Sequence, residues 1–175
     1  MKEIIVKDAD LRKAAENDDM DVFVALFVNA IREAIGGELS AENMSELNSD
    51  QITLLAWDIL HSEVMDGGAV QLIHNGYGAF IWMNPTDKAF RNWSQTPGCD
   101  ELFELYKWIN KSHKFYNLNH DKIEADCDDD DFMALFEQYP EFDDFDDEFV
   151  EKEEQWTMAV AQYIDENIDS FARIE

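Results

Sequence analysis

The chain has 175 residues, with 40 Asp and Glu against 13 Lys and Arg and a formal net charge of −27. Hydrophobic residues make up 46% of it and aromatic residues 13%, which excludes an acidic disordered protein, because such proteins lack the side chains for a core. We expect one domain over residues 1–175. The charge far exceeds the magnitude of about 2–8 that keeps a small domain soluble, which indicates a function for the charge itself.

The ends and cysteines of the chain indicate its compartment. The start, "MKEIIVKDADLRK", has no apolar core of the signal-peptide type, and the longest apolar stretch, "VFVALFVNAI", is about half a membrane span. Cys99 and Cys127 form no CxxC motif, so neither a disulfide framework nor a zinc site is indicated. We therefore expect a cytoplasmic protein with reduced thiols.

Apolar residues at helical spacing predict the elements of the first half of the chain. The predicted helices are residues 8–17, 19–35, 50–66 and 69–74. Asp18 or Asp19 can cap the second of these helices, and Gly36-Gly37 is typical of its end.

The helix predicted over residues 50–66 is apolar on most sides, which is typical of a helix at the centre of a fold. Gly67-Gly68 is predicted to end or break it. Asn75-Gly76 is then predicted to close the short helix that follows.

The second half of the chain continues the helical pattern. "FIWMNP" has a strand-like composition but no second run to pair with. Residues 98–116 are predicted to return to helical spacing with Asp100 as the cap, and a short helix is predicted to break near Pro140. Residues 145–171 keep apolar steps of three, four or seven and predict one long helix. We therefore predict an all-α bundle of about seven to nine helices with a long C-terminal helix and a highly acidic surface.

The stretch "CDDDDFMALFEQYPEFDDFDDEF", residues 127–149, contains no Lys, Arg or His. Its apolar residues recur at spacings of three and four, which predicts a helix with its acids on the outside. Residues 121–154 contain 17 acids and two lysines, a net charge of −15. As one helix at ~1.5 Å per residue they would carry one charge per ~3.4 Å, the density of a single DNA strand. The stretch therefore indicates a substitute for DNA, with an acidic soluble surface as the alternative.

No catalytic or metal motif competes strongly with this interpretation. Asp126, Asp128, Asp130 and Glu137 match positions 1, 3, 5 and 12 of a calcium loop, but Asp131 stands where that loop needs glycine. The four histidines form no HxxxH or HExxH pair, and GxSxG and phosphate-binding loops are absent from the sequence. We therefore predict neither an enzyme nor a bound cofactor or metal.

Two stretches resemble a known family. The first is "SEVMDGGAVQLIHNGYG", residues 62–78, and the second is "FEQYPEFDDFDDEFVEKEEQWTMAVAQYIDENIDSFA", residues 136–172. They are similar to the bacterial DNA-mimic family, once filed as a domain of unknown function, over about residues 50–172. The residues that carry the resemblance are Glu63, Gly67, Gly68, Gln71 and Asn75, followed by Phe145, Asp146, Asp147, Glu148 and Phe149.

The resemblance implies an all-helical and often dimeric protein without catalysis. Its carboxylates would imitate DNA phosphates, occupy the DNA-binding face of a helix-turn-helix transcription regulator and exclude the operator. The carboxylates that we predict to contact the partner are Asp128, Asp129, Asp130, Asp131, Asp143, Asp144, Asp146, Asp147, Glu151 and Glu154. One alternative is an immunity protein that neutralises a basic nuclease toxin. Another is a calcium or metal binder, or an enzyme with a carboxylate cluster.

Overall fold

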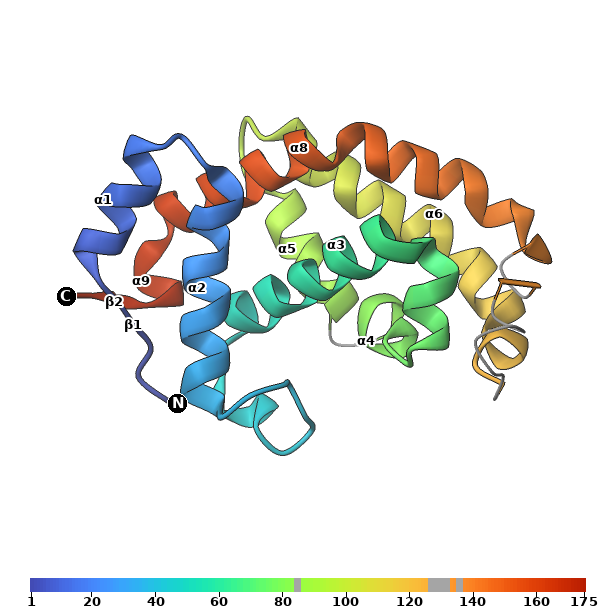
Figure 1. Ribbon diagram of the computed structural model, residues 1–175, viewed down its shortest axis with the longest axis horizontal. Helices are drawn as coiled ribbons and strands as arrows, with labels where there is room; N and C mark the ends of the chain where they lie inside the picture. The colour runs from blue at the N-terminus through green and yellow to red at the C-terminus, as the bar shows by residue number, and fades with distance from the viewer. Residues whose placement is uncertain (84–85, 126–132, 135–136) are drawn as a thin grey trace. The chain divides into compact units, whose positions relative to one another are not determined.

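The computed structural model describes residues 1–83, 86–125, 133–134 and 137–175. Within these ranges the regular structure is helical apart from two strands of two residues each (Figure 1), so the predicted all-α class is confirmed. In chain order the elements are β1 (Ile5–Val6), α1 (Asp8–Glu16), α2 (Met20–Ile35), η1 (Met44–Glu46), α3 (Ser49–His74), α4 (Gly78–Trp82), α5 (Thr86–Ser94), α6 (Asp100–Ile123), η2 (Pro140–Phe142), α8 (Asp143–Glu166), α9 (Ile168–Phe171) and β2 (Arg173–Ile174). Among the described residues, no helix combines enough length with enough apolar side chains to cross a bilayer.

The chain divides into two compact units. Unit 1 consists of Met1–Leu55 and Glu154–Glu175, and unit 2 consists of Ala56–Glu153. Unit 1 therefore joins the N-terminal helices to the C-terminal end of the chain. Unit 2 contains the first stretch of the family resemblance, residues 62–78, and the first half of the second, residues 136–153. The long helices α3 and α8 each contribute residues to both units.

Unit 1 is built around helix α2. The Asp19 side chain accepts a hydrogen bond from the Val22 N–H at 3.0 Å and caps the helix, and Gly36 ends it with a φ of +83°. Both predicted signals are therefore confirmed. Phe27 on the buried side of α2 packs against Phe171 of α9, with 6.3 Å between the ring centroids. The two strands pair in parallel and connect the beginning of the chain to its end.

Unit 2 packs the first part of α8 against α6 and α3. Phe149 of α8 is fully buried, lying 5.2 Å from the Trp108 ring of α6 and 6.0 Å from the Trp57 ring of α3. The Trp108 Nε1–H donates to the Phe145 carbonyl at 2.8 Å. Phe142, the last residue of η2 directly before α8, is also buried. These contacts confirm that Phe142, Phe145 and Phe149 of the acidic stretch pack into a core, whereas Phe132 and Phe136 lie outside the described residues.

The structure differs from the sequence predictions at two helix ends. Cys99 is the residue before α6 and Asp100 is already its first helical residue, so the prediction of Asp100 as the cap is wrong by one position. The predicted helix over 145–171 is interrupted at Asn167, whose φ of −127° and ψ of 32° are not helical. The Asn167 Nδ2–H donates to the Tyr163 carbonyl at 2.9 Å. This bond offers an alternative to the helical pattern, which is the usual behaviour of Asn near a helix end.

Candidate functional site

Helix α3 is broken by the glycine pair, as the sequence predicts. Gly67 has a φ of −148° and a ψ of 17°, and Gly68 has a φ of +77° and a ψ of −179°. The Gly68 conformation belongs to a region that only glycine adopts without strain. A Cβ added to Gly68 would also lie 2.3 Å from Oδ2 of Asp146. The position therefore requires glycine for two independent reasons.

The polar residues of the first resembling stretch form a hydrogen-bond network around this break. The Gln71 side-chain amide donates to Oε2 of Glu63 at 3.0 Å and to Oδ2 of Asp66 at 2.8 Å. The Asn75 amide donates to the same Glu63 oxygen at 2.9 Å. A Cβ on Gly67 would collide with the Gln71 side chain. These residues therefore hold the break in one geometry, which is a structural task.

Asp146 of the second stretch binds the backbone of α3 directly after the break. Its Oδ1 accepts a hydrogen bond from the Ala69 N–H at 2.8 Å. Ala69 is the first residue after the break, and the first N–H groups of a helical segment have no partner within it. A carboxylate at this place also interacts favourably with the helix dipole. Asp146 therefore acts as a cap supplied by a distant part of the chain.

The surroundings of Asp146 raise its pKa to about 6. Burial is the main cause, because it disfavours the charged form. The bond from Ala69 acts in the opposite direction, and the neighbouring Asp143 and Asp147 carboxylates raise the pKa further by repulsion. The fold therefore gives this half-buried carboxylate a pKa closer to neutral pH than that of an ordinary Asp.

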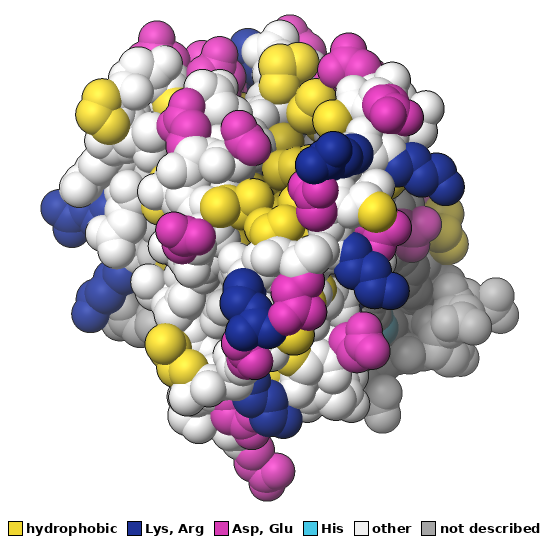
Figure 2. All heavy atoms as spheres, turned by 90° about the vertical axis from the view of Figure 1, so that its left-hand side faces the viewer, with side chains coloured by type: hydrophobic (Ala, Val, Ile, Leu, Met, Phe, Trp, Pro, Cys, Tyr) yellow, Lys and Arg dark blue, Asp and Glu magenta, His cyan; other side chains and the backbone are white. Residues whose placement is uncertain are grey.

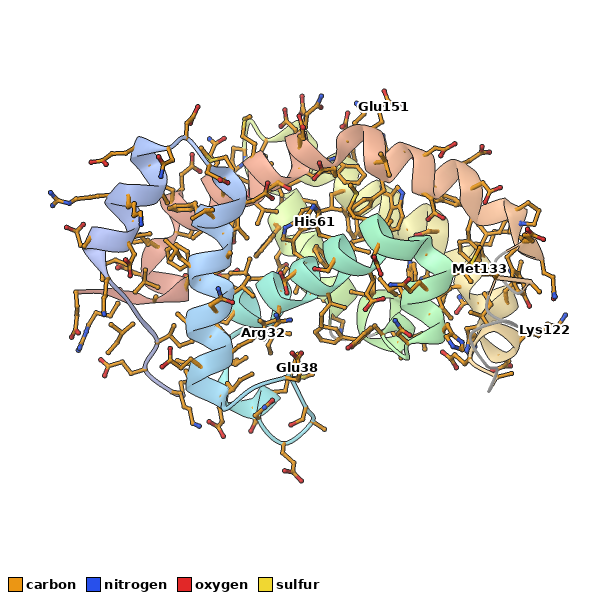
Figure 3. All side chains as sticks on the ribbon, in the orientation of Figure 1. Arg32, Glu38, His61, Lys122, Met133 and Glu151 are labelled. Carbon is orange, nitrogen blue, oxygen red and sulfur yellow. The ribbon has the colours of Figure 1, made fainter. Side chains whose placement is uncertain are left out.

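A different set of carboxylates faces outward from α8. These exposed residues are Asp143, Asp144, Asp147, Glu151 and Glu154. Their spacing places them along one side of the helix, opposite the buried Phe149. Figure 3 shows Glu151 projecting away from the α8 ribbon. Among the described residues, none of the five makes a side-chain hydrogen bond or ion pair, so they stay available to a partner.

The structure separates the ten predicted partner-binding carboxylates into three groups. Asp128 to Asp131 lie outside the described residues. Asp146 is directed toward α3 and is engaged by the Ala69 N–H. The remaining five form the outward row of α8. A further acid, Glu153, was not predicted to have a role, and its Oε2 lies 2.9 Å from Nε2 of His61 of α3.

A family model described as "DMP19-like protein" matches residues 45–167, well over half of the chain. The chain belongs to the DMP19-like protein family. It is also 35% identical over 134 residues to a protein of Neisseria meningitidis serogroup B (strain ATCC BAA-335 / MC58) named "DNA mimic protein DMP19". That alignment covers 76% of this chain and 77% of the relative. The family resemblance predicted from the two stretches is therefore confirmed.

The DMP19-like match includes the whole arrangement around the glycine break and the outward row of α8. Helices α1 and α2 precede the matched residues. Within the matched residues, the first stretch contains the glycine break of α3, and the second contains Asp146, which caps the helical segment after the break. The residues that identify the family in the sequence are thus mainly those that fix α8 against α3, and the outward carboxylates are the surface that this framework presents.

One group of side chains at the end of α6 has the composition of a metal site. The ligand atoms of His120, Asp121 and Glu124 lie within 4.8 Å of one another, and all three residues are exposed or half-buried. Lys122 extends from the same helical turn (Figure 3). The acids of the calcium-loop pattern, Asp126, Asp128 and Asp130, lie outside the described residues. Exposed acidic groups of this kind are common without an ion, so the cluster assigns no chemistry to the protein.

The glycine requirement at the break gives a first prediction. Gly68→Ala should lower the free energy of unfolding by about 3 kcal/mol or more, because it combines backbone strain with a collision at Asp146. Gly76→Ala is the matched control, since Gly76 has a φ of +86° but open space around it. It should cost only about 1 kcal/mol of backbone strain. Urea unfolding measures both values, and equal losses would show that the Asp146 contact is unimportant.

The raised pKa of Asp146 gives a second prediction. An Asp in an unfolded chain has a pKa of about 3.9, so between this value and about 6 the folded protein binds more protons than the unfolded chain. The free energy of unfolding must then fall as pH rises through this window. Asp146→Asn keeps an oxygen acceptor for the Ala69 N–H and removes the titration. Its stability should fall less than that of the wild type across the window, and parallel curves in urea titrations would contradict the assignment.

Proposed function

We propose that this protein is a DNA mimic that binds the DNA-binding face of a helix-turn-helix transcription regulator and blocks its access to DNA. The observation that carries the proposal is the outward row of α8, five exposed carboxylates without a described partner on one side of a helix. The name of the 35% identical relative, a DNA mimic protein, supports it. The proposal includes no catalytic step.

The spacing of the outward row fits the charge density of DNA. Asp143 and Glu154 are separated by eleven residues, or ~16.5 Å at ~1.5 Å per residue. Counted per residue, the twelve residues from 143 to 154 occupy ~18 Å, so five carboxylates give one charge per ~3.6 Å, against ~3.4 Å for one strand of duplex DNA. The Arg and Lys side chains with which a regulator contacts DNA phosphates can also form ion pairs with carboxylates. An Arg that grips a phosphate through two N–H groups can grip a carboxylate likewise.

The helix that carries the outward row is fixed by contacts on its opposite side. Phe142 and Phe149 bury the opposite side of α8, and Asp146 fixes its rotation through Ala69. A charged surface that needs no reordering on binding avoids part of the entropy cost of association. The net charge of −27 would add attraction to a basic partner at a distance and speed the encounter. This attraction weakens as salt shortens the Debye length.

The proposed partner is a basic DNA-binding protein in the cytoplasm. Pairing of two copies, which we also propose, would place two acidic helices in one assembly and raise the density toward that of a duplex. The same electrostatics would suit a basic nuclease toxin as the target. The experiment must therefore identify the partner as well as measure the charge effect.

A four-residue charge variant tests the outward row. Asp143→Asn, Asp144→Asn, Asp147→Asn and Glu151→Gln together remove four negative charges and leave Asp146 and the buried aromatic residues unchanged. Binding to the regulator, captured on the immobilised protein from a native cell extract and identified by mass spectrometry, should weaken. At about 0.2–1 kcal/mol per exposed charge, the four changes together cost about 0.8–4 kcal/mol, so the Kd should rise by about fourfold to several hundredfold.

The matched control removes four exposed charges elsewhere. Asp10→Asn, Glu16→Gln, Glu33→Gln and Glu42→Gln give the same net charge but change residues that precede the family match. This variant should retain most of the affinity. Equal weakening by both variants would mean that net charge alone drives binding. A captured protein that still binds its operator in the complex would refute mimicry, and a captured nuclease would favour the immunity function.

A further inference from the structure

Unit 1 contains an apolar groove that the proposed function does not use. Its volume is about 340 Å³, and it lies between the end of α1, the start of α2 and the C-terminal part of α8. Its apolar lining residues are Ala14, Ala15, Met20, Phe23, Met158 and Ala161. The volume is at the lower end of the range for ligand sites, about 300–1,000 Å³. The groove can therefore receive one or two large side chains, but not a whole helix.

Part of the groove lining is exposed to solvent. Figure 2, which shows the side of the molecule with α1 and α2, has hydrophobic side chains gathered toward the middle and charged side chains around them. Met158 lines the groove and is 59% exposed, which is high for a large apolar side chain. Methionine is flexible and adapts to different apolar surfaces, and it is frequent at binding surfaces for this reason.

The charges of the groove have one sign. Asp19 and Asp165 are its charged lining residues, and no Lys or Arg is found in its lining within the part of the chain that the structure describes. Two cations of unit 1 are engaged elsewhere, because Arg12 pairs with Asp8 at 2.7 Å and Arg173 pairs with Glu3 at 2.6 Å. An apolar groove with acids on it is complementary to an apolar side chain that has Lys or Arg beside it.

The groove combines a family helix with elements from outside the family match. Residues 14–23 precede the matched range of 45–167, while Met158 and Asp165 lie within it or at its end. The surface is therefore not a property of the matched segment alone. Such a place can distinguish one basic partner from another, since the outward row recognises charge but little else.

We propose that this groove binds an apolar anchor side chain flanked by Lys or Arg on the basic partner of the protein. The biological identity of this partner rests on the proposed function, whereas the chemistry of the groove does not. The mode is that of a segment whose apolar residue enters a groove while its cations contact the acids beside it. The groove then adds selectivity to an interaction whose attraction comes from α8.

Methionine methyl groups allow a direct test. The chain has seven Met residues, of which Met20 and Met158 line the groove, while Met65 and Met133 line a separate hollow of about 450 Å³ beside the glycine break. The full-length protein, labelled with ¹³C at the Met methyl groups, is titrated with a synthetic helical peptide of Lys and Leu. The Met20 and Met158 signals should shift with saturation, and the Met65 and Met133 signals should stay unchanged.

Two control peptides separate the parts of the proposal. A peptide with Glu in place of each Lys should give no shift, and a peptide with Ser in place of each Leu should bind without moving the Met20 and Met158 signals. Equal shifts with the Glu peptide would mean that the acids have no role. Equal shifts with the Ser peptide, or shifts confined to Met65 and Met133, would overturn the groove as the site.

A matched pair of variants completes the test. Met158→Lys places a cation in the groove and should weaken binding of the Lys and Leu peptide about tenfold or more, read from the Met20 signal. Val150→Lys makes the same charge change at a residue of α8 that is 54% exposed and does not line the groove, and it should have little effect. Equal weakening by the two would refute the groove site.

The outward-row variant keeps this proposal separate from the proposed function. With Asp143, Asp144, Asp147 and Glu151 changed, the peptide should still shift Met20 and Met158, because all of the groove residues are unchanged. If the wild-type groove fails to bind the peptide while the outward-row variant loses its natural partner, the groove proposal falls and the mimic function stands. The opposite result would leave a groove for basic segments without DNA mimicry.

Discussion

The hydrogen bond between the Ala69 N–H and the Asp146 carboxylate is the contact on which the presentation of α8 depends. It ties α8 to the point where α3 resumes after its break. Because side chains on a helix are separated by fixed angles, holding Asp146 and Phe149 against α3 and α6 determines which other residues of α8 face the solvent. The carboxylates at 143, 147, 151 and 154 face outward as a consequence. The contact between Asp146 and Ala69 thus determines which carboxylates of α8 belong to the outward row.

This arrangement has an energetic cost that the protein accepts. Asp146 is half-buried in a chain with a net charge of −27, and its raised pKa is the thermodynamic expression of that burial. The outward carboxylates repel one another as well, which destabilises the compact state. The aromatic contacts of Phe149 with Trp57 and Trp108 act against these costs. The packing of the aromatic core therefore offsets part of the destabilisation that the acidic composition causes.

The sequence was sufficient for most of the fold, because helices have a local signature. The period of apolar residues, the Asp19 cap, the Gly36 end and the Gly67-Gly68 break are all readable without tertiary contacts. The helix end at Asn167 was missed, since the apolar spacing continues past it to Phe171. The cap of α6 was misplaced by one residue because Asp100 is as typical of the first turn of a helix as of its cap.

The candidate site was less predictable, because its parts are far apart in the chain. The interruption at Gly68 indicates that a new helical segment begins with unpaired N–H groups, but 40 acids are available to pair with them. From the sequence, both Asp146 and Asp147 are predicted to contact the partner. Only the packing of α8 on α3 separates the carboxylate that holds the structure from the one that faces the solvent.

The two sides of α8 are consequently open to different kinds of evolutionary change. On the inner side, a replacement of Asp146 or Gly68 demands a compensating change at the other residue, so the two should vary together or not at all. The exposed carboxylates of the outer side make no side-chain hydrogen bond or ion pair with described residues, so Asp and Glu can exchange there without loss of the fold. Lineages that inherit this helix can therefore drift toward new basic targets while the framework beneath stays constant.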